Sequence, residues 1–480
     1  MAEKSKYFLA LDRKDGGFSG YVVTKKLEYL NNPPPAPERR PPENPSPPED
    51  ANSFEDVFAW FRATIDTYRN FLDFIITLAP LASSILAERT ITQFAQSNGQ
   101  KREDLSTPDR TVFEIDASSL RRLTAHQEEI EAGLRGAKHL PEVMLIGLIS
   151  AYDAFLGKLL RVVFTRVPDL VLSSEKTIKL SELSEYESID AARRSLIEKE
   201  IESVLRDSHH AHFEWMEKKF KLSLRSDLPA FTKFVELCER RNLFTHTGGL
   251  VSSQYINNCR EFGVDLRDAK VGDHLTVDAA YYREAVNVIC EIGIKLCYVL
   301  WRKFAKDKRS DADNALNQFC YDLIVRRNYG TAEAILSFAS QWAEADRTRR
   351  MMIVNHANAI RLQDRESEAL KVLDKEDWTA VLEEFQISVA AVRGYVDEIV
   401  RLMKRIGSHG YPSADDYRTW PVFRGMRTNP KFSEAFEEVF GQPLIVQTTS
   451  IEVENATIGV QPEAEPEPKP DQNSEPQSLH

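Results

Sequence analysis

The residues best suited to chemistry lie in one short segment, residues 239–249, which holds two arginines, an asparagine and a histidine. Arg241 is a permanent cation whose forked N–H donors match a phosphate group. His246 can gain or lose a proton near neutral pH. Such residues can hold a phosphate and move protons around it without a metal ion.

The same segment is typical of the end of a helix. Phe234, Val235 and Leu237 keep a helical apolar spacing ahead of it, and Gly248 and Gly249 follow it. Glycine supplies the left-handed backbone conformation at which helices commonly end. We therefore expect a rigid helix terminus to carry the arginine and the histidine.

The spacing constrains how these side chains can meet. Asn242 and His246 are four residues apart and share one helix face, whereas Arg241 and His246 lie about 140° apart around an ideal helix. Arg241 must therefore curl back towards His246, or the helix must unwind at Thr245. The alternative is a surface arginine together with a histidine that caps the helix C-terminus, where the helix dipole stabilises it.

The segment resembles the signature of the HEPN (higher eukaryotes and prokaryotes nucleotide-binding) superfamily. In that signature an arginine, often followed directly by a polar residue, precedes a histidine by a few residues, and Arg241, Asn242 and His246 fit it. A second run, Ser150-Ala-Tyr152-Asp153-Ala-Phe155, is similar to a Ser-x-Tyr-acidic-x-Phe run in the first long helix of HEPN proteins. Asp153 either orients the Arg241 guanidinium or faces solvent, and the sequence leaves both possibilities open.

The resemblance implies a metal-independent endoribonuclease without a cofactor. Arg241, His246 and Asn242 would be catalytic, with Asp153 and Arg240 in supporting positions. RNA carries its own nucleophile, the 2′-hydroxyl, so the products would be a 2′,3′-cyclic phosphate and a 5′-hydroxyl.

One histidine cannot easily serve both the attacking and the leaving oxygen. The resemblance therefore implies a homodimer in which two motifs face each other across a two-fold axis. In HEPN toxins that are silenced by nucleotidylation, a tyrosine stands two residues after the motif histidine. Gly248 stands there in this chain, so that form of control is not expected.

The net charge of −12 does not exclude an RNA-binding protein. Residues 446–480 contain seven acidic residues and one lysine, which accounts for about half of that charge. The rest of the chain is only mildly acidic, and an RNA site needs only a local basic patch. Lys218, Lys219, Lys221 and Arg225 form one basic run, either a solvated face or a track for an RNA backbone.

Metal and membrane sites are not expected. The five cysteines lack the spacing of a structural zinc site, and His209, His210 and His212 have no matching carboxylate or cysteine set nearby. The nearest candidate for a membrane span, residues 71–87, is interrupted by Asp73 and Pro80. The first residues contain no apolar signal core, so we expect a cytoplasmic protein.

Hydrophobic periodicity and composition predict an all-α chain with disordered Pro-rich and acidic segments. The resemblance implies that its central part is a HEPN-like helical bundle, and an array of helix pairs follows it. Pro141 is expected to begin the most apolar helix, because proline suits the first turn. The predicted organisation is a small β-hairpin at 1–30, a Pro-rich linker at 31–50, a helical region at 51–135 with a short extended piece near 111–117, the HEPN-like domain at 136–305, repeats at 311–443 and a disordered tail at 444–480.

The array at 311–443 resembles tetratricopeptide repeats, since the segments 333–336 and 368–370 are similar and about 35 residues apart. Such arrays usually bind a protein or peptide. The leading hypothesis is a toxin or antiphage-defence ribonuclease regulated by its repeats. The alternatives are a non-catalytic dimeric scaffold that binds nucleotide, RNA or protein, and a purely structural helical scaffold in which Arg241 and His246 face apart.

Overall fold

A computed structural model describes residues 8–14, 17–24, 52–105, 111–172, 186–226, 228–266 and 269–444. The chain is all-α, as the sequence predicts, and its described strands form short two-stranded ribbons. The predicted linker at 31–50 and residues 445–480 of the predicted tail lie outside the described residues. The chain divides into two units, Glu43–Ala435 and a second formed from Met1–Pro42 and Phe436–His480.

The smaller unit contains a β-hairpin near the N-terminus. Strands β1 (Phe8–Lys14) and β2 (Gly17–Thr24) are antiparallel, and Leu9 stands opposite Val23. The register shifts between Asp12 and Arg13. These strands fall where the alternating pattern of the first thirty residues predicts a hairpin.

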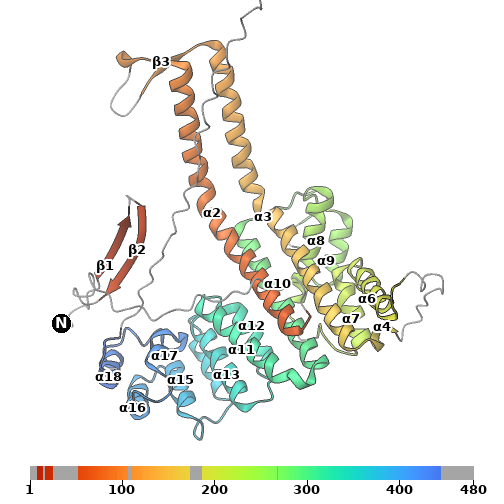
Figure 1. Cartoon of the computed structure of the whole chain (residues 1–480), viewed down its shortest axis with the longest axis vertical. Helices are drawn as coiled ribbons and strands as arrows, with labels where there is room; N and C mark the ends of the chain where they lie inside the picture. Colours follow the sequence, from red (N-terminus) through yellow and green to blue (C-terminus); the bar gives the residue numbers. More distant parts are fainter. Residues whose placement is uncertain are drawn as a thin grey trace, which may run out of the picture. The chain divides into compact units, whose positions relative to one another are not determined.

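Two long helices begin the larger unit and lie side by side (Figure 1). Helix α2 (Phe54–Asn98) begins with a capping box in which Ser53 and Asp56 bond each other's backbone N–H groups, and Asp116 caps α3 (Ala117–Arg166). A small ribbon joins the helices, built from β3 (Gly99–Lys101), the 3-10 turn η1 (Glu103–Leu105) and β4 (Phe113–Ile115).

Helix α3 does not begin at Pro141, as the sequence suggests, but runs through it. A proline inside a helix removes one backbone hydrogen bond. Packing against α2 on both sides of Pro141 offsets that loss. The Phe94 and His126 ring centroids lie 5.7 Å apart before the proline, and those of Phe61 and Phe155 lie 4.0 Å apart after it. The predicted boundary at 135/136 therefore falls inside one continuous helix.

The described part of α3 from Lys138 to Arg166 is long and apolar enough to cross a membrane by length and composition alone. This segment, rather than residues 71–87, is the candidate found among the described residues. About half of its most apolar stretch, 56%, is buried inside the protein. Its side chains Leu148, Phe155 and Leu159 belong to the main hydrophobic core, which is the ordinary environment of a central bundle helix.

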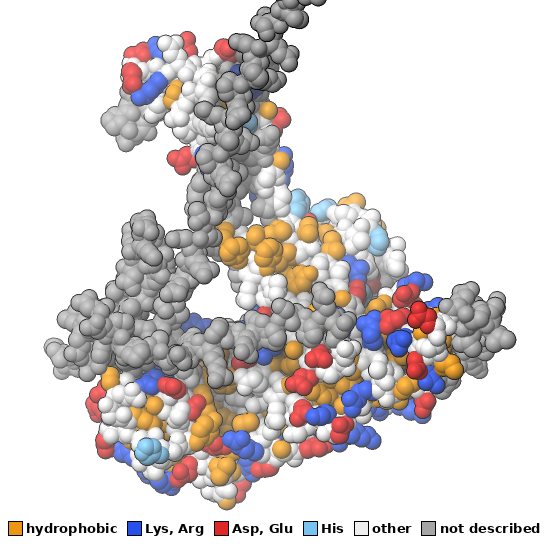
Figure 2. All heavy atoms as spheres, viewed as in Figure 1, with side chains coloured by type: hydrophobic (Ala, Val, Ile, Leu, Met, Phe, Trp, Pro, Cys, Tyr) orange, Lys and Arg blue, Asp and Glu red, His pale blue; other side chains and the backbone are white. Residues whose placement is uncertain are grey.

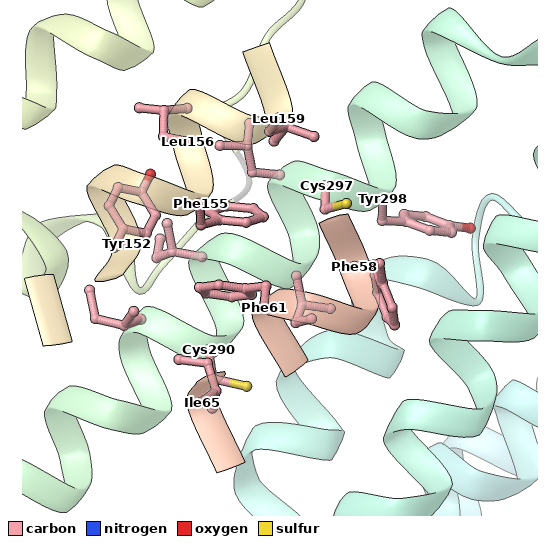
Figure 3. Packing of buried hydrophobic residues seen from close by; sticks show 14 of the residues in the cluster. Phe58, Phe61, Ile65, Tyr152, Phe155, Leu156, Leu159, Cys290, Cys297 and Tyr298 are labelled. Carbon is pink, nitrogen blue, oxygen red and sulfur yellow. The ribbon is translucent and has the colours of Figure 1, made fainter. Parts of the chain in front are cut away.

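Further helices pack around the C-terminal half of α3 to form the bundle: α4 (Asp169–Leu172), α6 (Ile189–Leu205), α7 (His209–Phe220), α8 (Phe231–Thr247), α9 (Ser253–Glu261) and α10 (Ala279–Phe304). Figure 3 shows the centre of this core, where Phe61 of α2 and Phe155 of α3 meet beside Cys290 of α10. All five cysteines are buried free thiols.

The chain continues as an array of shorter helices: η2 (Lys306–Lys308), α11 (Arg309–Val325), α12 (Tyr329–Ala339), α13 (Asp346–Arg361), α14 (Glu366–Leu373), α15 (Glu383–Arg393), α16 (Val396–Ile406), α17 (Ala414–Thr419), η3 (Pro421–Phe423) and α18 (Pro430–Phe440). Successive helices from α11 to α16 contact their neighbours in chain order. The similar segments 333–336 and 368–370 lie on α12 and α14.

The surface of the bundle carries mixed charge. Figure 2 shows basic and acidic side chains interspersed over the region of α4, α6 and α7. Arg225, from the basic run in the sequence, is bound to Glu217 at 2.7 Å and to Glu214 at 3.0 Å. Its charge is therefore already balanced within the fold.

Candidate active site

Helix α8 positions the sequence motif. The helix ends at Gly248, whose φ of +63° is left-handed, and Gly249 follows with φ of +90°. The N–H groups of both glycines donate to the Leu243 carbonyl, which satisfies a carbonyl at the helix end. The helix terminus is thus where the paired glycines predict it.

The backbone remains helical through Thr245. The Thr245 hydroxyl donates to the Arg241 carbonyl at 2.9 Å, and the Thr247 hydroxyl donates to the Leu243 carbonyl at 2.9 Å. These side-chain bonds to the preceding turn are compatible with an intact helix. The unwinding that could bring Arg241 and His246 together therefore does not occur.

Asp153 of α3 receives the Arg241 guanidinium. The Arg241 Nη2 lies 3.4 Å from Asp153 Oδ2, although 88 residues separate them in the chain. The exposed fractions of the two side chains are 18% for Arg241 and 30% for Asp153. Of the two possibilities for Asp153, this contact matches the one in which the carboxylate orients the arginine.

His209, the first residue of α7, completes a cluster of three charged or polar side chains. Its Nε2 lies 2.8 Å from Asp153 Oδ1 and 3.4 Å from Arg241 Nη2. Since the carboxylate can only accept and the guanidinium can only donate, the short contact assigns the Nε2 proton to the bond with Asp153. The Asp153 carboxylate is therefore shared: Oδ1 accepts the hydrogen bond from His209, and Oδ2 contacts Arg241.

Two buried polar atoms around this cluster have no hydrogen-bond partner among the described residues: Nε of Arg241 and the hydroxyl of Tyr152. The His212 ring centroid lies 5.3 Å from that of His209, and Tyr152 packs on Phe234 at 5.1 Å. Unpaired polar atoms are costly in a protein interior, so such atoms call for an explanation, and a functional role is one.

The electrostatics of the cluster disfavour new charge. Burial, together with the nearby His209, lowers the pKa of His212 to about 4, so this ring is neutral at pH 7. Burial raises the pKa of the Tyr152 hydroxyl well above its usual value, and burial with the Asp153 charge raises the pKa of the Cys238 thiol. Cys238 is therefore a protonated thiol and not a nucleophile.

His246 does not join the cluster. Its side chain is exposed in the last turn of α8, and Asn242 is half-buried. Within the part of the chain that the structure describes, His246 makes no hydrogen bond or ion pair with Arg241. The structure therefore brings together Arg241 and Asp153 but leaves His246 at the surface of the single chain.

Arg240 belongs to a different network. Its Nε donates to Glu236 Oε1 at 2.7 Å, its Nη1 donates to the Thr276 carbonyl at 3.1 Å, and its guanidinium lies 4.2 Å from the Tyr281 ring centroid. The Tyr255 hydroxyl also donates to Glu236, at 2.8 Å. These contacts tie α8 to α9 and α10, so Arg240 supports the position of the helix.

The sequence draws attention to the histidine run 209–212, but it does not predict that His209 contacts Asp153. The signal is three histidines in four positions, which suggests metal ligands rather than a partner for Asp153. Across the described residues, no three His, Cys, Asp or Glu side chains are grouped so that they could hold a metal ion. His210 points elsewhere, with its ring centroid 4.8 Å from that of Phe262.

Comparison of the chain with protein-family models, with curated proteins and with solved structures found no match.

Proposed function

We propose that this chain is a metal-independent endoribonuclease of the HEPN type. One observation carries the proposal: Asp153 contacts Arg241, and these two residues belong to the two separate segments that resemble the HEPN signature. Two matches 88 residues apart would meet in this way only by coincidence if the resemblance were accidental. The meeting of the two segments supports the family assignment more than either motif does alone.

In the proposed reaction the RNA 2′-oxygen attacks the adjacent phosphorus. The 2′-hydroxyl loses its proton, the bond from phosphorus to the 5′-oxygen breaks, and the 5′-oxygen takes up a proton. Arg241 would offset the charge that develops on the phosphoryl oxygens. His246 would take or supply a proton, and Asn242 would orient His246 or the RNA backbone.

The proposed active form is a homodimer. In one chain Arg241 points towards Asp153 and His209, while His246 is exposed one turn further on. A second chain related by a two-fold axis would bring a second exposed histidine to the same phosphate. Such an arrangement supplies one histidine for each of the attacking and leaving oxygens.

In this proposal the protein works in the cytoplasm as a toxin or antiphage-defence effector. The helix array from α11 to α18 would bind a protein partner and regulate cleavage.

The non-catalytic alternative also has an observation in its favour. Arg241 and His246 do not converge within one chain, and a scaffold that binds RNA, nucleotide or protein through a HEPN-like bundle would not need them to do so. Measurement of cleavage separates the two functions directly.

The test compares the wild type with Arg241→Ala and His246→Ala on total RNA and on tRNA in EDTA. The expected result is cleavage with cyclic-phosphate ends by the wild type and by a control variant, but not by Arg241→Ala or His246→Ala. His409→Ala is a matched control, because His409 is also exposed but lies in the repeat array. Equal activity in all four proteins, or activity that requires a divalent metal, contradicts the proposal.

A further inference from the structure

A cavity of about 700 Å³ lies between the helical bundle and the first helices of the array. Its walls come from the loop after α7 (Leu222, Leu224), from α10 (Leu296, Val299) and from the end of α12 (Phe338). None of its lining residues belongs to the Asp153, His209 and Arg241 cluster. The volume falls in the range of roughly 300–1,000 Å³ that is typical of small-molecule sites.

The cavity offers an aromatic surface that is held in place. The Phe338 ring packs edge-on against Tyr298, with centroids 6.3 Å apart. Trp342 follows α12, and its backbone carbonyl accepts a 2.6 Å bond from Arg302 Nη2. Trp342 is nevertheless 58% exposed. An exposed indole on a fixed backbone is a suitable platform for a flat ring.

The lining of the cavity contains five basic side chains. Three of its five cations are already engaged: Lys295 with Glu291, Arg302 with Asp313, and Arg309 with Glu344. The other two, Lys303 and Lys306, form no ion pair with any described residue. Among the described residues that line the cavity, Glu344 is the only acidic one, and Arg309 contacts it at 2.6 Å. The unbalanced charge is therefore positive, and it comes from two lysines.

These features together specify a ligand with a flat aromatic part and a phosphate group. We propose that this cavity binds a nucleotide, with the base against Trp342 and the phosphates at Lys303 and Lys306. Lysine ammonium groups are common phosphate ligands, and base stacking on an aromatic side chain is favourable for any base. A fatty-acid anion would use the apolar wall and the charge but would leave the indole platform without a role.

Because α10, α12 and the intervening segment all contribute to the cavity, a bound nucleotide would contact both the bundle and the array. The site is separate from the proposed RNA-cleaving residues, so the binding proposal does not depend on ribonuclease activity.

The test is isothermal titration calorimetry of the full-length chain with ATP, adenosine, tripolyphosphate and palmitate. ATP is expected to bind at least tenfold more tightly than adenosine. The variant with both Lys303→Glu and Lys306→Glu is expected to bind ATP at least tenfold more weakly. Trp342→Ala should weaken the binding of ATP but leave that of tripolyphosphate within twofold.

Lys371→Glu is the matched control, since Lys371 is exposed on α14 and does not line the cavity. It should bind ATP within twofold of the wild type, and circular dichroism should show that every variant is folded. Arg241→Ala should also retain ATP binding, which separates this proposal from the proposed cleavage. Absence of ATP binding at millimolar concentration, equal binding by the lysine variant, or binding of palmitate without ATP would overturn the nucleotide assignment.

Discussion

Asp153 determines where the Arg241 guanidinium lies. Its two oxygens contact two different side chains, His209 at 2.8 Å and Arg241 at 3.4 Å. Loss of the carboxylate would leave the guanidinium without a charged partner. That loss is costly because all three side chains are mostly shielded from water. The exposure of Asp153, 30%, limits the energetic penalty of that loss.

We therefore expect Asp153→Asn to lower the free energy of unfolding by about 1–2 kcal/mol. We also expect RNA cleavage to fall by about 10- to 100-fold, because a small displacement of Arg241 is enough to lose catalytic alignment. Urea denaturation and a cleavage assay measure the two effects. The control is Asp374→Asn, which removes an exposed carboxylate 2.8 Å from Arg393 and should change stability by less than about 0.5 kcal/mol. Equal effects of the two substitutions would contradict a special role for Asp153.

His212, in the same region, should make the stability of the protein depend on pH. Its folded-state pKa of about 4 lies below the value of about 6.5 expected in the unfolded chain. The unfolded chain therefore binds more protons between these pH values. The stability associated with neutral His212 is fully present above about pH 6.5 and is lost as the pH falls towards 4.

From pH 7.5 to pH 5 this single group should lower the free energy of unfolding by about 2 kcal/mol. In His212→Leu that part of the pH dependence should disappear. A share due to His356 should remain, because burial also lowers its pKa to about 4. Urea titrations at both pH values give the comparison, with the exposed His409→Leu as control. If His212→Leu and His409→Leu have the same pH dependence, His212 is not buried as a neutral ring.

At the scale of elements, α2 and α10 approach each other closely at Gly293. A Cβ atom at Gly293 of α10 would overlap the Phe61 ring of α2. Phe61 in turn stacks on Phe155 of α3, with ring centroids 4.0 Å apart (Figure 3). Three helices thus meet where one of them has no side chain, and the stacking restricts how far the Phe61 ring can move aside.

Gly293→Ala should therefore destabilise the bundle by about 1–3 kcal/mol. This cost arises although alanine is the better helix former by about 1 kcal/mol. Thermal unfolding followed by circular dichroism measures the change. Gly136→Ala is the control, because a Cβ there meets nothing within 4 Å, and it should be neutral or stabilising. The second substitution Phe61→Leu should recover part of the loss in Gly293→Ala. Additive effects of the two substitutions would show that the ring is not the obstacle.

At the scale of the whole molecule, the exposed His246 requires a second chain if the proposed chemistry is correct. We expect the protein to form a homodimer of about 110 kDa, twice the chain mass of 54.8 kDa. Light scattering after size-exclusion chromatography measures this mass at the concentration used for the cleavage assay. A monomer that cleaves RNA at full rate would contradict the composite site while leaving the ribonuclease activity intact.

The sequence alone determined the features that depend on neighbouring residues. Helical periodicity predicted the all-α class, and the paired glycines predicted the end of α8. Adjacent glycines permit left-handed backbone conformations whatever the rest of the fold does. Local patterns also placed the short strand before α3, since a polar break interrupts the helical periodicity there.

Only the tertiary structure decided which residues meet. His209, Asp153 and Arg241 lie on three different helices, and their contact depends on how those helices pack rather than on any local pattern. Packing also carried α3 through Pro141, because contacts with α2 on both sides offset the lost hydrogen bond. For the same reason the cavity beside Trp342 could not be predicted, since it lies between helices brought together by the core and its charge balance depends on which lysines remain unpaired.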